Sequence, residues 1–311
     1  MVFTEKVNIL FTSQLTGWEL AKVNYGLLSE VRTRYLDFGN FEVKIQFNPG
    51  RMRSSAAKVD AKSIEARPCF LCKTNRPSQQ EDLIFSDKYT ILVNPFPIFF
   101  RHLTIPAEQH TDQRIKENFE DLLMLAEALP GFVIFYNGPQ CGASAPDHLH
   151  FQAGNRGFMP IEKDFQNEKL VVLSGVKKGV EIWQWRGYQR GIITLKGSVR
   201  EGFLKAFSYF YEKLSDIQPA RPEPMLNILA SFDNNGWRVD IIPRKIHRPA
   251  QFFLDGSDRI LISPASVDLG GAIITPREED FQRLEIADVA DIFRQVCFDE
   301  NEVEKLIKGY L

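Results

Sequence analysis

The stretch GASAPDHLHFQAG, residues 142–154, places His148, His150 and Gln152 at alternate positions. Alternation by two is the period of a β-strand, so the pattern predicts a strand that presents these three side chains on one face. A loop of three small residues, 142–144, precedes it, and such loops let backbone N–H groups approach an anion closely. The stretch therefore indicates a site for chemistry on a phosphate.

The bulk composition limits the class of protein. A chain of 311 residues exceeds the roughly 250–300 residues at which a single core stops growing, which predicts two modules. The net charge of −2 argues against a nucleic-acid carrier. No apolar run is long enough to span a bilayer, the N-terminus lacks the pattern of a signal peptide, and four cysteines do not suggest a disulfide framework. We expect a cytoplasmic protein with neither nucleic-acid nor membrane partners.

The first half of the chain has the pattern of an antiparallel α+β module. Apolar spacing predicts helices over 14–35 and 111–129, and strands over 41–47, 89–100, 102–106 and 132–136. The loop and strand of 142–154 follow the last of these. Strands that alternate with a single helix in this order favour an antiparallel sheet.

The second half repeats this theme weakly. Residues 225–232 and 236–243 read as two strands, joined by the hairpin sequence Asp-Asn-Asn-Gly. The segments 101–110 and 237–247 also share Ile-Pro-x-x-x-His. We therefore expect a diverged duplication, with a catalytic domain over 1–170 and a companion domain over 171–311. Only the first copy carries the His-x-His pair.

Cys69 and Cys72 form a metal half-site, because thiolates at this spacing can bind one tetrahedral ion. No second pair of this kind exists, so histidines or carboxylates must supply the other ligands. If His150 performs chemistry, His110 and His148 are the economical choice. A redox-active pair and two plain buried thiols are the alternatives.

At this point the residues resemble a known superfamily. HLTIPAEQH, residues 102–110, and HLHFQ, residues 148–152, are similar to the histidine-triad superfamily. Gln152 stands where the hydrolases of that superfamily carry a third histidine, and this variant resembles the transferase and phosphorylase branch. That branch includes galactose-1-phosphate uridylyltransferase and diadenosine tetraphosphate phosphorylase. The longer run 148–163 is most similar to GDP-hexose phosphorylases.

The resemblance implies an α+β fold in which one antiparallel histidine-triad-like module is followed by a second, diverged one. It also implies a structural zinc ion held by Cys69, Cys72, His110 and His148, as in the uridylyltransferases. Two departures leave the substrate open. Leu149 replaces the proline of the uridylyltransferase motif, and GDP-hexose phosphorylases are not defined by this cysteine pair.

The chemistry of the residues suggests a role for each. A neutral imidazole at His150 can attack an α-phosphorus if a carbonyl near His148 holds its other ring nitrogen. Gln152 can donate its amide to a non-bridging oxygen, and Ser144 can bind the phosphates. The further candidates for substrate binding are Gly142, Ala143, Asn94, Asn137, Lys163 and Arg244.

These roles predict a nucleotidyltransferase that transfers a nucleoside monophosphate through a covalent intermediate on His150. We expect phosphorolysis of a nucleotide-sugar, with a GDP-hexose as candidate. A dinucleoside polyphosphate phosphorylase and a hexose-1-phosphate uridylyltransferase are alternatives, and a non-catalytic nucleotide sensor is the alternative of another class. The expected partners are a nucleotide-sugar or dinucleotide, phosphate, and a second copy of the chain in a homodimer.

Overall fold

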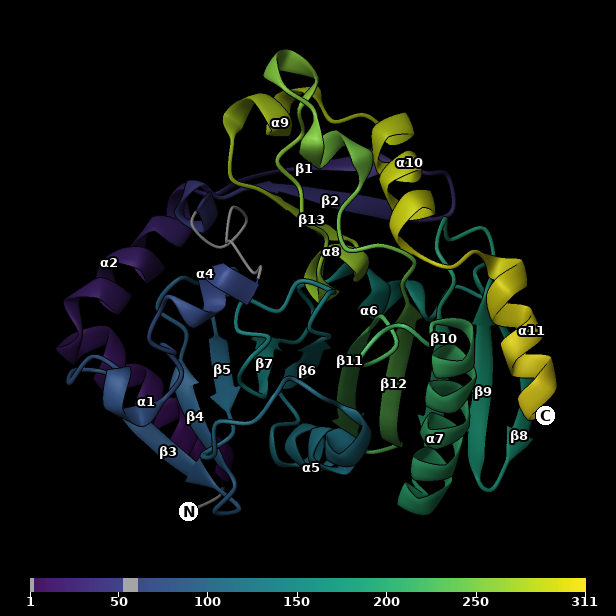
Figure 1. The fold of residues 1–311 in the computed structure, drawn as a ribbon, viewed down its shortest axis with the longest axis horizontal. Coiled ribbons are helices and arrows are strands. Elements are labelled where there is room, and N and C mark those ends of the chain that lie inside the picture. The colour runs from purple at the N-terminus through teal and green to yellow at the C-terminus, as the bar shows by residue number, and fades with distance from the viewer. Residues whose placement is uncertain (1–2, 53–60) are drawn as a thin grey trace.

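One ten-stranded sheet runs through the computed structural model, which describes residues 3–52 and 61–311 (Figure 1). All neighbouring strands in this sheet are antiparallel. In spatial order they are β3 (Asp82–Phe85), β4 (Tyr89–Val93), β5 (His102–Pro106), β7 (His150–Asn155), β6 (Phe132–Asn137), β11 (Leu226–Asp233), β12 (Gly236–Pro243), β10 (Ile193–Gly197), β9 (Val180–Trp185) and β8 (Val171–Lys177).

The sheet is an internal duplication whose halves meet at the pairing of β6 with β11. From the outer edge inward, the first half has the order β3-β4-β5-β7-β6 and the second has β8-β9-β10-β12-β11. Helix α5 (Phe119–Ala128) follows the third strand of the first half, and α7 (Arg200–Ile217) follows the third strand of the second. The predicted α+β class with two similar modules is confirmed. The position of the boundary between residues 170 and 171 stays a prediction.

The short sequence match that suggested the duplication joins strands that do not correspond. Residues 102–106 form β5, the third strand of its half, whereas residues 237–243 lie in β12, the fourth strand of the other half. In the duplicated order, the strand equivalent to β5 is β10, and the strand equivalent to β12 is β7. Order within the sheet, which no short motif reveals, therefore establishes the repeat.

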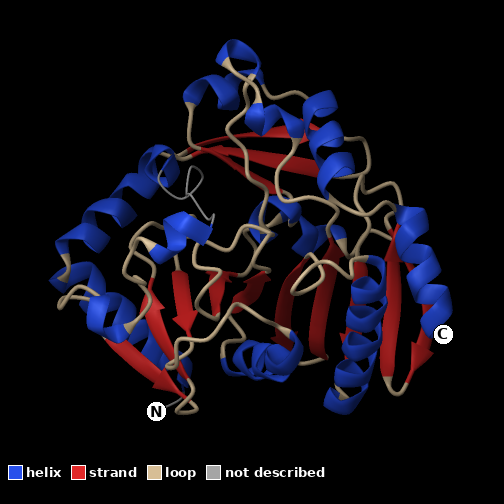
Figure 2. Ribbon diagram, viewed as in Figure 1, coloured by secondary structure: helices blue, strands red, loops and turns tan. Residues whose placement is uncertain are grey.

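The two faces of the large sheet have separate covers. One apolar core packs α5, α7, α1 (Phe3–Gly17) and α11 (Glu300–Tyr310) against one face. On the other face lies a three-stranded sheet of β1 (Arg32–Asp37), β2 (Glu42–Phe47) and β13 (Ala272–Thr275), seen above the large sheet in Figures 1 and 2. Because β13 pairs in parallel with β2, early and late segments of the chain jointly cover the face that carries the site.

Two predicted helices are shorter than the apolar spacing suggested. The helix expected over 14–35 is broken at Trp18, whose backbone is extended, and α2 (Glu19–Gly26) ends before residues 32–37 pair with β2 as strand β1. The helix expected over 111–129 begins only at residue 119, because the backbone before it hydrogen-bonds to the segment that enters β7. The strands over 41–47 and 132–136 and the hairpin before Gly236 are confirmed.

Among the described residues, no helix is both long and apolar enough to cross a bilayer.

A glycine in β7 tests the packing beneath the site. A Cβ at Gly154 would lie well inside van der Waals contact with the buried ring of Phe99, which packs against Phe135 and Phe158. We expect Gly154→Ala to lower the free energy of unfolding by about 1–3 kcal/mol, because an overpacked ring cannot move freely. Gly131→Ala is the matched control, since open space surrounds that position. Urea unfolding of both variants measures the difference, and equal stabilities would contradict it.

Candidate active site

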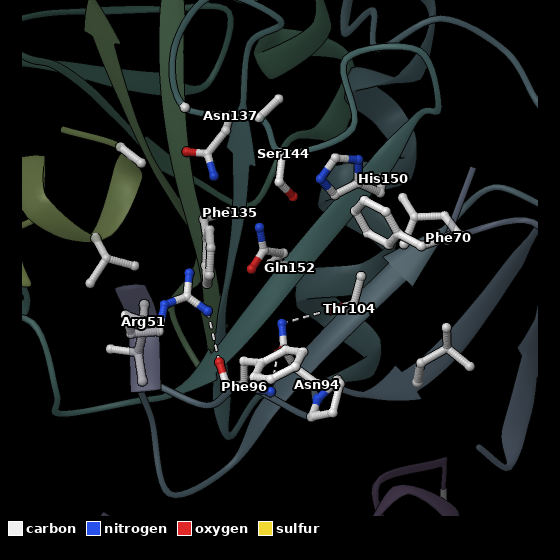
Figure 3. Close-up of a pocket in the computed structure, with 18 of the residues that line it drawn as sticks. Arg51, Phe70, Asn94, Phe96, Thr104, Phe135, Asn137, Ser144, His150 and Gln152 are labelled. Atoms are coloured by element: carbon white, nitrogen blue, oxygen red, sulfur yellow. Dashed lines mark hydrogen bonds between the residues drawn. The ribbon is translucent and has the colours of Figure 1, made fainter. Parts of the chain in front are cut away.

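A cavity of about 550 Å³ opens on the face of β7 that lies under the small sheet. In Figure 3, Ser144, Asn137, Gln152 and His150 gather toward one end, while Arg51 lies toward the other. Both halves of the chain contribute to its wall. Of the residues that the sequence singles out, the cavity is lined by Asn94, Asn137, Gly142, Ala143, Ser144, His150 and Gln152.

His150 is held as a neutral imidazole with one ring nitrogen toward the cavity. Its Nδ1 lies 2.8 Å from the carbonyl oxygen of His148, so Nδ1 carries the hydrogen and Nε2 keeps the lone pair. Burial lowers the pKa of His150 to about 4. The backbone N–H of His150 donates to Gln113 Oε1 (2.8 Å), and Gln113 Nε2 donates to the carbonyls of Asn137 (2.9 Å) and His150 (3.0 Å). Gln113, which sequence reasoning missed, ties β7 to the end of β6.

The amide of Gln152 is oriented by a residue that the sequence analysis did not assign. The N–H of Ile98 donates to His102 Nδ1 (3.2 Å), so the hydrogen of this imidazole sits on Nε2 and is donated to Gln152 Oε1 (3.0 Å). Burial, with a further contribution from Arg51, lowers the pKa of His102 to about 3 and keeps the ring neutral. With its oxygen occupied, Gln152 presents its NH₂ group to the cavity.

Asn137 is oriented in the same way, by the second half of the chain. Its Oδ1 accepts from Asn227 Nδ2 (2.8 Å) and from the backbone N–H (2.9 Å) and hydroxyl (2.7 Å) of Ser266. Its NH₂ group is therefore the one available to a ligand. The neighbouring small-residue loop also touches the second half: Gly142 has a φ of +97°, and a Cβ there would lie 2.6 Å from the Cβ of Ala265. Only glycine fits this position.

The far end of the cavity is shaped by a turn and a buried cation. Asn94 uses both ends of its amide within the protein, since Oδ1 accepts from the N–H of Phe96 and Nδ2 donates to Thr104 Oγ1 (2.9 Å each). Arg51 Nη1 donates to the carbonyl of Phe96 (2.7 Å). Burial lowers the pKa of Arg51 to about 10, while the carboxylate of Asp268 opposes this shift. Neither Arg51 nor Asp268 has a sequence pattern that reveals it.

The four predicted metal ligands come together beside the cavity. The ligand atoms of Cys69, Cys72, His110 and His148 all lie within 4.8 Å of one another. Cys69 Sγ is 3.3 Å from His148 Nδ1, and Cys72 Sγ is 3.1 Å from His110 Nδ1. His148 Nε2 lies 2.8 Å from the carbonyl of Ala107, so its hydrogen is there and the Nδ1 lone pair faces the thiols. Two thiols and two oriented imidazoles are able to hold a tetrahedral metal ion.

Two predicted substrate-binding residues lie away from the cavity. Lys163 is exposed and pairs with Glu42 (3.4 Å) on the surface. Arg244 is fully buried and donates to Asn227 Oδ1 (2.7 Å), to the carbonyl of Pro264 (3.0 Å) and to three further carbonyls. Of the basic run Arg244, Lys245 and Arg248, which suggested a phosphate site at Arg244, only Arg248 lies in the cavity wall.

The second half of the sheet carries different residues at the positions equivalent to His150 and Gln152. On β12, Asp240 lies between a threonine of β10 and a leucine of β11. On β7, Gln152 lies in the same way between a threonine of β5 and a phenylalanine of β6. Arg238 stands two residues before Asp240, at the position where His150 stands two residues before Gln152. The Arg238 guanidinium lies 3.0 Å from the Asp240 carboxylate and 4.2 Å from the centre of the Phe165 ring, and it donates to carbonyls of α6 (Pro160–Asp164). This pocket is filled by the chain itself.

Comparison with known proteins supports the fold. The family described as Domain of unknown function (DUF4922) matches residues 10–155, and the family described as GDPGP1-like, C-terminal domain matches residues 160–310. These two matches agree with the predicted resemblance to the galactose-1-phosphate uridylyltransferase and GDP-hexose phosphorylase-like branch of the histidine-triad superfamily. No curated protein gives a significant match.

Among solved structures, the chain is similar to yeast Ap4A phosphorylase Apa2. The two share 17% identity over 90% of this chain and 94% of that one, with a TM-score of 0.58. The structure of the same enzyme in complex with AMP gives 17% identity over 92% and 97%, with a TM-score of 0.59. Its complex with Ap4A gives 17% over 90% and 96%, also with a TM-score of 0.59. The TM-scores show that the two proteins share a fold, whereas 17% identity gives no information about a shared substrate.

The contrast between Arg244 and Lys163 can be tested by stability. We expect Arg244→Met to lower the free energy of unfolding by about 3 kcal/mol or more, because several buried oxygens lose their donor. Lys163→Met should change it by less than about 0.5 kcal/mol, as is usual for an exposed ion pair. Chemical denaturation followed by fluorescence measures both. An Arg244→Met variant of unchanged stability would contradict the structural role.

Proposed function

We propose that this chain is a nucleotidyltransferase of the phosphorylase type, which moves a nucleoside monophosphate from a nucleotide-sugar to phosphate through a covalent intermediate on His150. The observation that carries the proposal is the neutral imidazole whose Nδ1–H is bound by the His148 carbonyl, 2.8 Å away. This leaves a nucleophilic Nε2 at the wall of a cavity. The amide donors of Gln152 and Asn137 lie on the same wall, where a phosphoryl group would need them.

The reaction consists of two displacements at phosphorus. In the first, Nε2 of His150 forms a bond to the α-phosphorus, the bond from that phosphorus to the bridging oxygen breaks, and hexose 1-phosphate leaves. In the second, a phosphate oxygen attacks the same phosphorus, the phosphorus–nitrogen bond breaks and a nucleoside diphosphate is formed. The imidazole regains its lone pair, so no proton donor is consumed over the cycle. The NH₂ groups of Gln152 and Asn137 stabilise the charge that builds on the equatorial oxygens.

Gln152 favours phosphate over water as the second nucleophile. Its amide cannot protonate a poor leaving group, and its oxygen, already bound to His102, is too weak a base to deprotonate water. A phosphate monoester leaves as a stable anion and a phosphate attacks as one, so neither step needs a general acid or base at this position. A hydrolase would need such a group.

A dinucleoside polyphosphate phosphorylase is the second candidate. The cavity extends to Trp18 and Phe70, whose rings could stack on a second base as well as on a sugar. The fold likeness to a phosphorylase of Ap4A points the same way. A hexose-1-phosphate uridylyltransferase would share both displacements and differ only in its acceptor. A sensor without turnover would not require the tautomer that His150 is given.

We further propose zinc as the metal of the cluster. Two thiolates and two imidazoles form a closed set of four ligands, which is typical of structural zinc rather than of a site with an open position. The ion would cross-link the loop of Cys69 and Cys72 to the segments of His110 and His148, and thereby fix the start of β7. Asp147, 3.7 Å from His110 Nε2, orients that imidazole from outside the cluster.

Metal analysis tests the zinc proposal. Protein washed with a weak chelator should retain about one zinc ion per chain. Cys69→Ser should lose most of this zinc and unfold at a lower temperature, because the thiolate is a ligand. Cys141→Ser is the matched control: Cys141 is also a buried free thiol but lies outside the cluster. Equal zinc content in the two variants, or stable wild-type protein with none, would contradict the site.

Covalent labelling tests the nucleophile. A nucleotide-sugar labelled at the α-phosphorus should leave acid-labile label on the protein, and added phosphate should release it as nucleoside diphosphate much faster than water does. His150→Ala should abolish the label and lower turnover by about three powers of ten or more, while nucleotide binding persists. Gln152→Ala should still be labelled, but slowly. Label on another residue, or rapid turnover by His150→Ala, would refute the mechanism, and a panel of nucleotide-sugars and dinucleotides would identify the substrate.

A further inference from the structure

A carboxylate of the second half is buried behind the strand that carries Asn137. Glu223 lies between α7 and β11 and is only 3% exposed. Its Oε1 accepts from the hydroxyl of Tyr136 (2.7 Å), and its Oε2 accepts from the backbone N–H of Ile115 (2.6 Å). Tyr136 belongs to the apolar core under the helices, whereas its neighbours on β6, Phe135 and Asn137, line the cavity. Glu223 therefore acts from the face of the sheet opposite the cavity.

The two groups that Glu223 binds lie beside those that Gln113 joins. One of them is two residues after Gln113 in the chain, and the other immediately precedes Asn137. Gln113 is fully buried and donates to the carbonyl of Asn137 (2.9 Å). It also accepts from the N–H of His150 (2.8 Å) and donates to the carbonyl of the same residue (3.0 Å). Glu223 thus holds the segment of Gln113 against the end of β6, and Gln113 holds the backbone of His150.

Other hydrogen bonds tie the same segment to the chain that enters β7. The N–H of Gln113 donates to the carbonyl of Pro146 (3.1 Å), and the carbonyl of Thr111 accepts from the N–H of Leu149 (2.6 Å). Glu223 adds a tie to β6 from the opposite face of the sheet. The segment therefore bridges the two strands that carry Asn137 and His150, and the Glu223 carboxylate helps to set their separation.

Both hydrogen bonds can form in either protonation state of Glu223. Burial raises the pKa of Glu223 to about 7. The N–H of Ile115, the hydroxyl of Tyr136 and the charge of Arg114 oppose this shift. The ionised carboxylate accepts from both donors, while the acid form accepts from the N–H and donates to the tyrosine oxygen. A glutamine would form the same two bonds, whereas a leucine would form neither.

We propose that Glu223 is a positioning residue for the nucleophile. Through the segment of Gln113, it fixes the backbone of His150 and with it the direction of the Nε2 lone pair. This inference rests on the proposed function. Neither Glu223 nor Gln113 lines the cavity, so the loss of Glu223 should slow the first displacement and leave nucleotide binding almost unchanged.

The rate of labelling tests the role of Glu223. A nucleotide-sugar labelled at the α-phosphorus is mixed with excess protein, and the rate of label uptake is followed against concentration. We expect Glu223→Leu to lower the maximal rate by about tenfold or more, because a misplaced nucleophile reacts slowly. The half-saturating concentration should change by less than about twofold. Glu223→Gln should keep the rate of the wild type.

Asp164→Leu is the matched control. Asp164 is also a buried carboxylate that accepts from a tyrosine hydroxyl, that of Tyr188 (2.8 Å), and neither of the two lines the cavity. We expect Asp164→Leu to lower the melting temperature, as Glu223→Leu does, but to leave the labelling rate unchanged. Equal slowing by the two leucine variants would show a general loss of packing and would overturn the positioning role.

Nitrogen NMR of the histidine rings tests the same role without turnover. The chain has five histidines, and the signal that His150→Ala removes belongs to His150. We expect the ring hydrogen on Nδ1 in the wild type, Glu223→Gln and Asp164→Leu, and a mixture of both tautomers in Glu223→Leu. A Glu223→Leu variant with one tautomer and the labelling rate of the wild type would overturn the inference. Wild-type protein that takes up no label would overturn the proposed function, and the tautomer would then decide the role of Glu223 by itself.

Discussion

The antiparallel pairing of β6 with β11 is the constraint on which the site depends. It places Asn137 directly opposite Asn227 at the strand ends, so that the Asn227 amide reaches both Asn137 Oδ1 (2.8 Å) and the carbonyl of Cys141 (2.9 Å). Arg244 in turn holds the oxygen of Asn227 (2.7 Å). Through this series of buried hydrogen bonds, residues of the second half fix the position of the loop in the first half. Without this joint, the loop would have no partner and the cavity would lack one wall.

The two halves of the duplicated fold carry different residues at the position of the cavity. At the position of His150, β12 has Arg238, whose charge is neutralised by Asp240 and whose guanidinium is covered by Phe165. The second half contributes to the cavity by another route, through His247, Arg248 and Ser263 in its wall. The asymmetry therefore lies in the side chains on β7 and β12, while the strand order of the two halves of the sheet stays alike.

The sequence allowed the local features to be predicted and left the distant contacts open. Spacing alone places His150 and Gln152 on one strand face, and Cys69 and Cys72 at ligand distance, because these relations span only a few residues. The prediction that His148 shares that face is wrong, because β7 begins at His150 and the His148 imidazole lies with the two cysteines. His102 and Gln113 act through partners that only the sheet register brings near, so no local pattern marks them. Arg244 was assigned to substrate binding because a run of basic residues can hold a phosphate, whereas here this member is buried against backbone carbonyls.

His148 links the cluster of Cys69, Cys72 and His110 to His150 through two different groups. Its imidazole belongs to the cluster, while its backbone carbonyl accepts the Nδ1–H of His150 (2.8 Å) and its own N–H donates to the carbonyl of Ala145 (3.1 Å). A displacement of the imidazole would therefore tilt the carbonyl that sets the tautomer and direction of His150. The cluster needs no contact with a ligand to influence the site. Holding the backbone of one residue is sufficient, because the ring of His150 takes its orientation from that backbone.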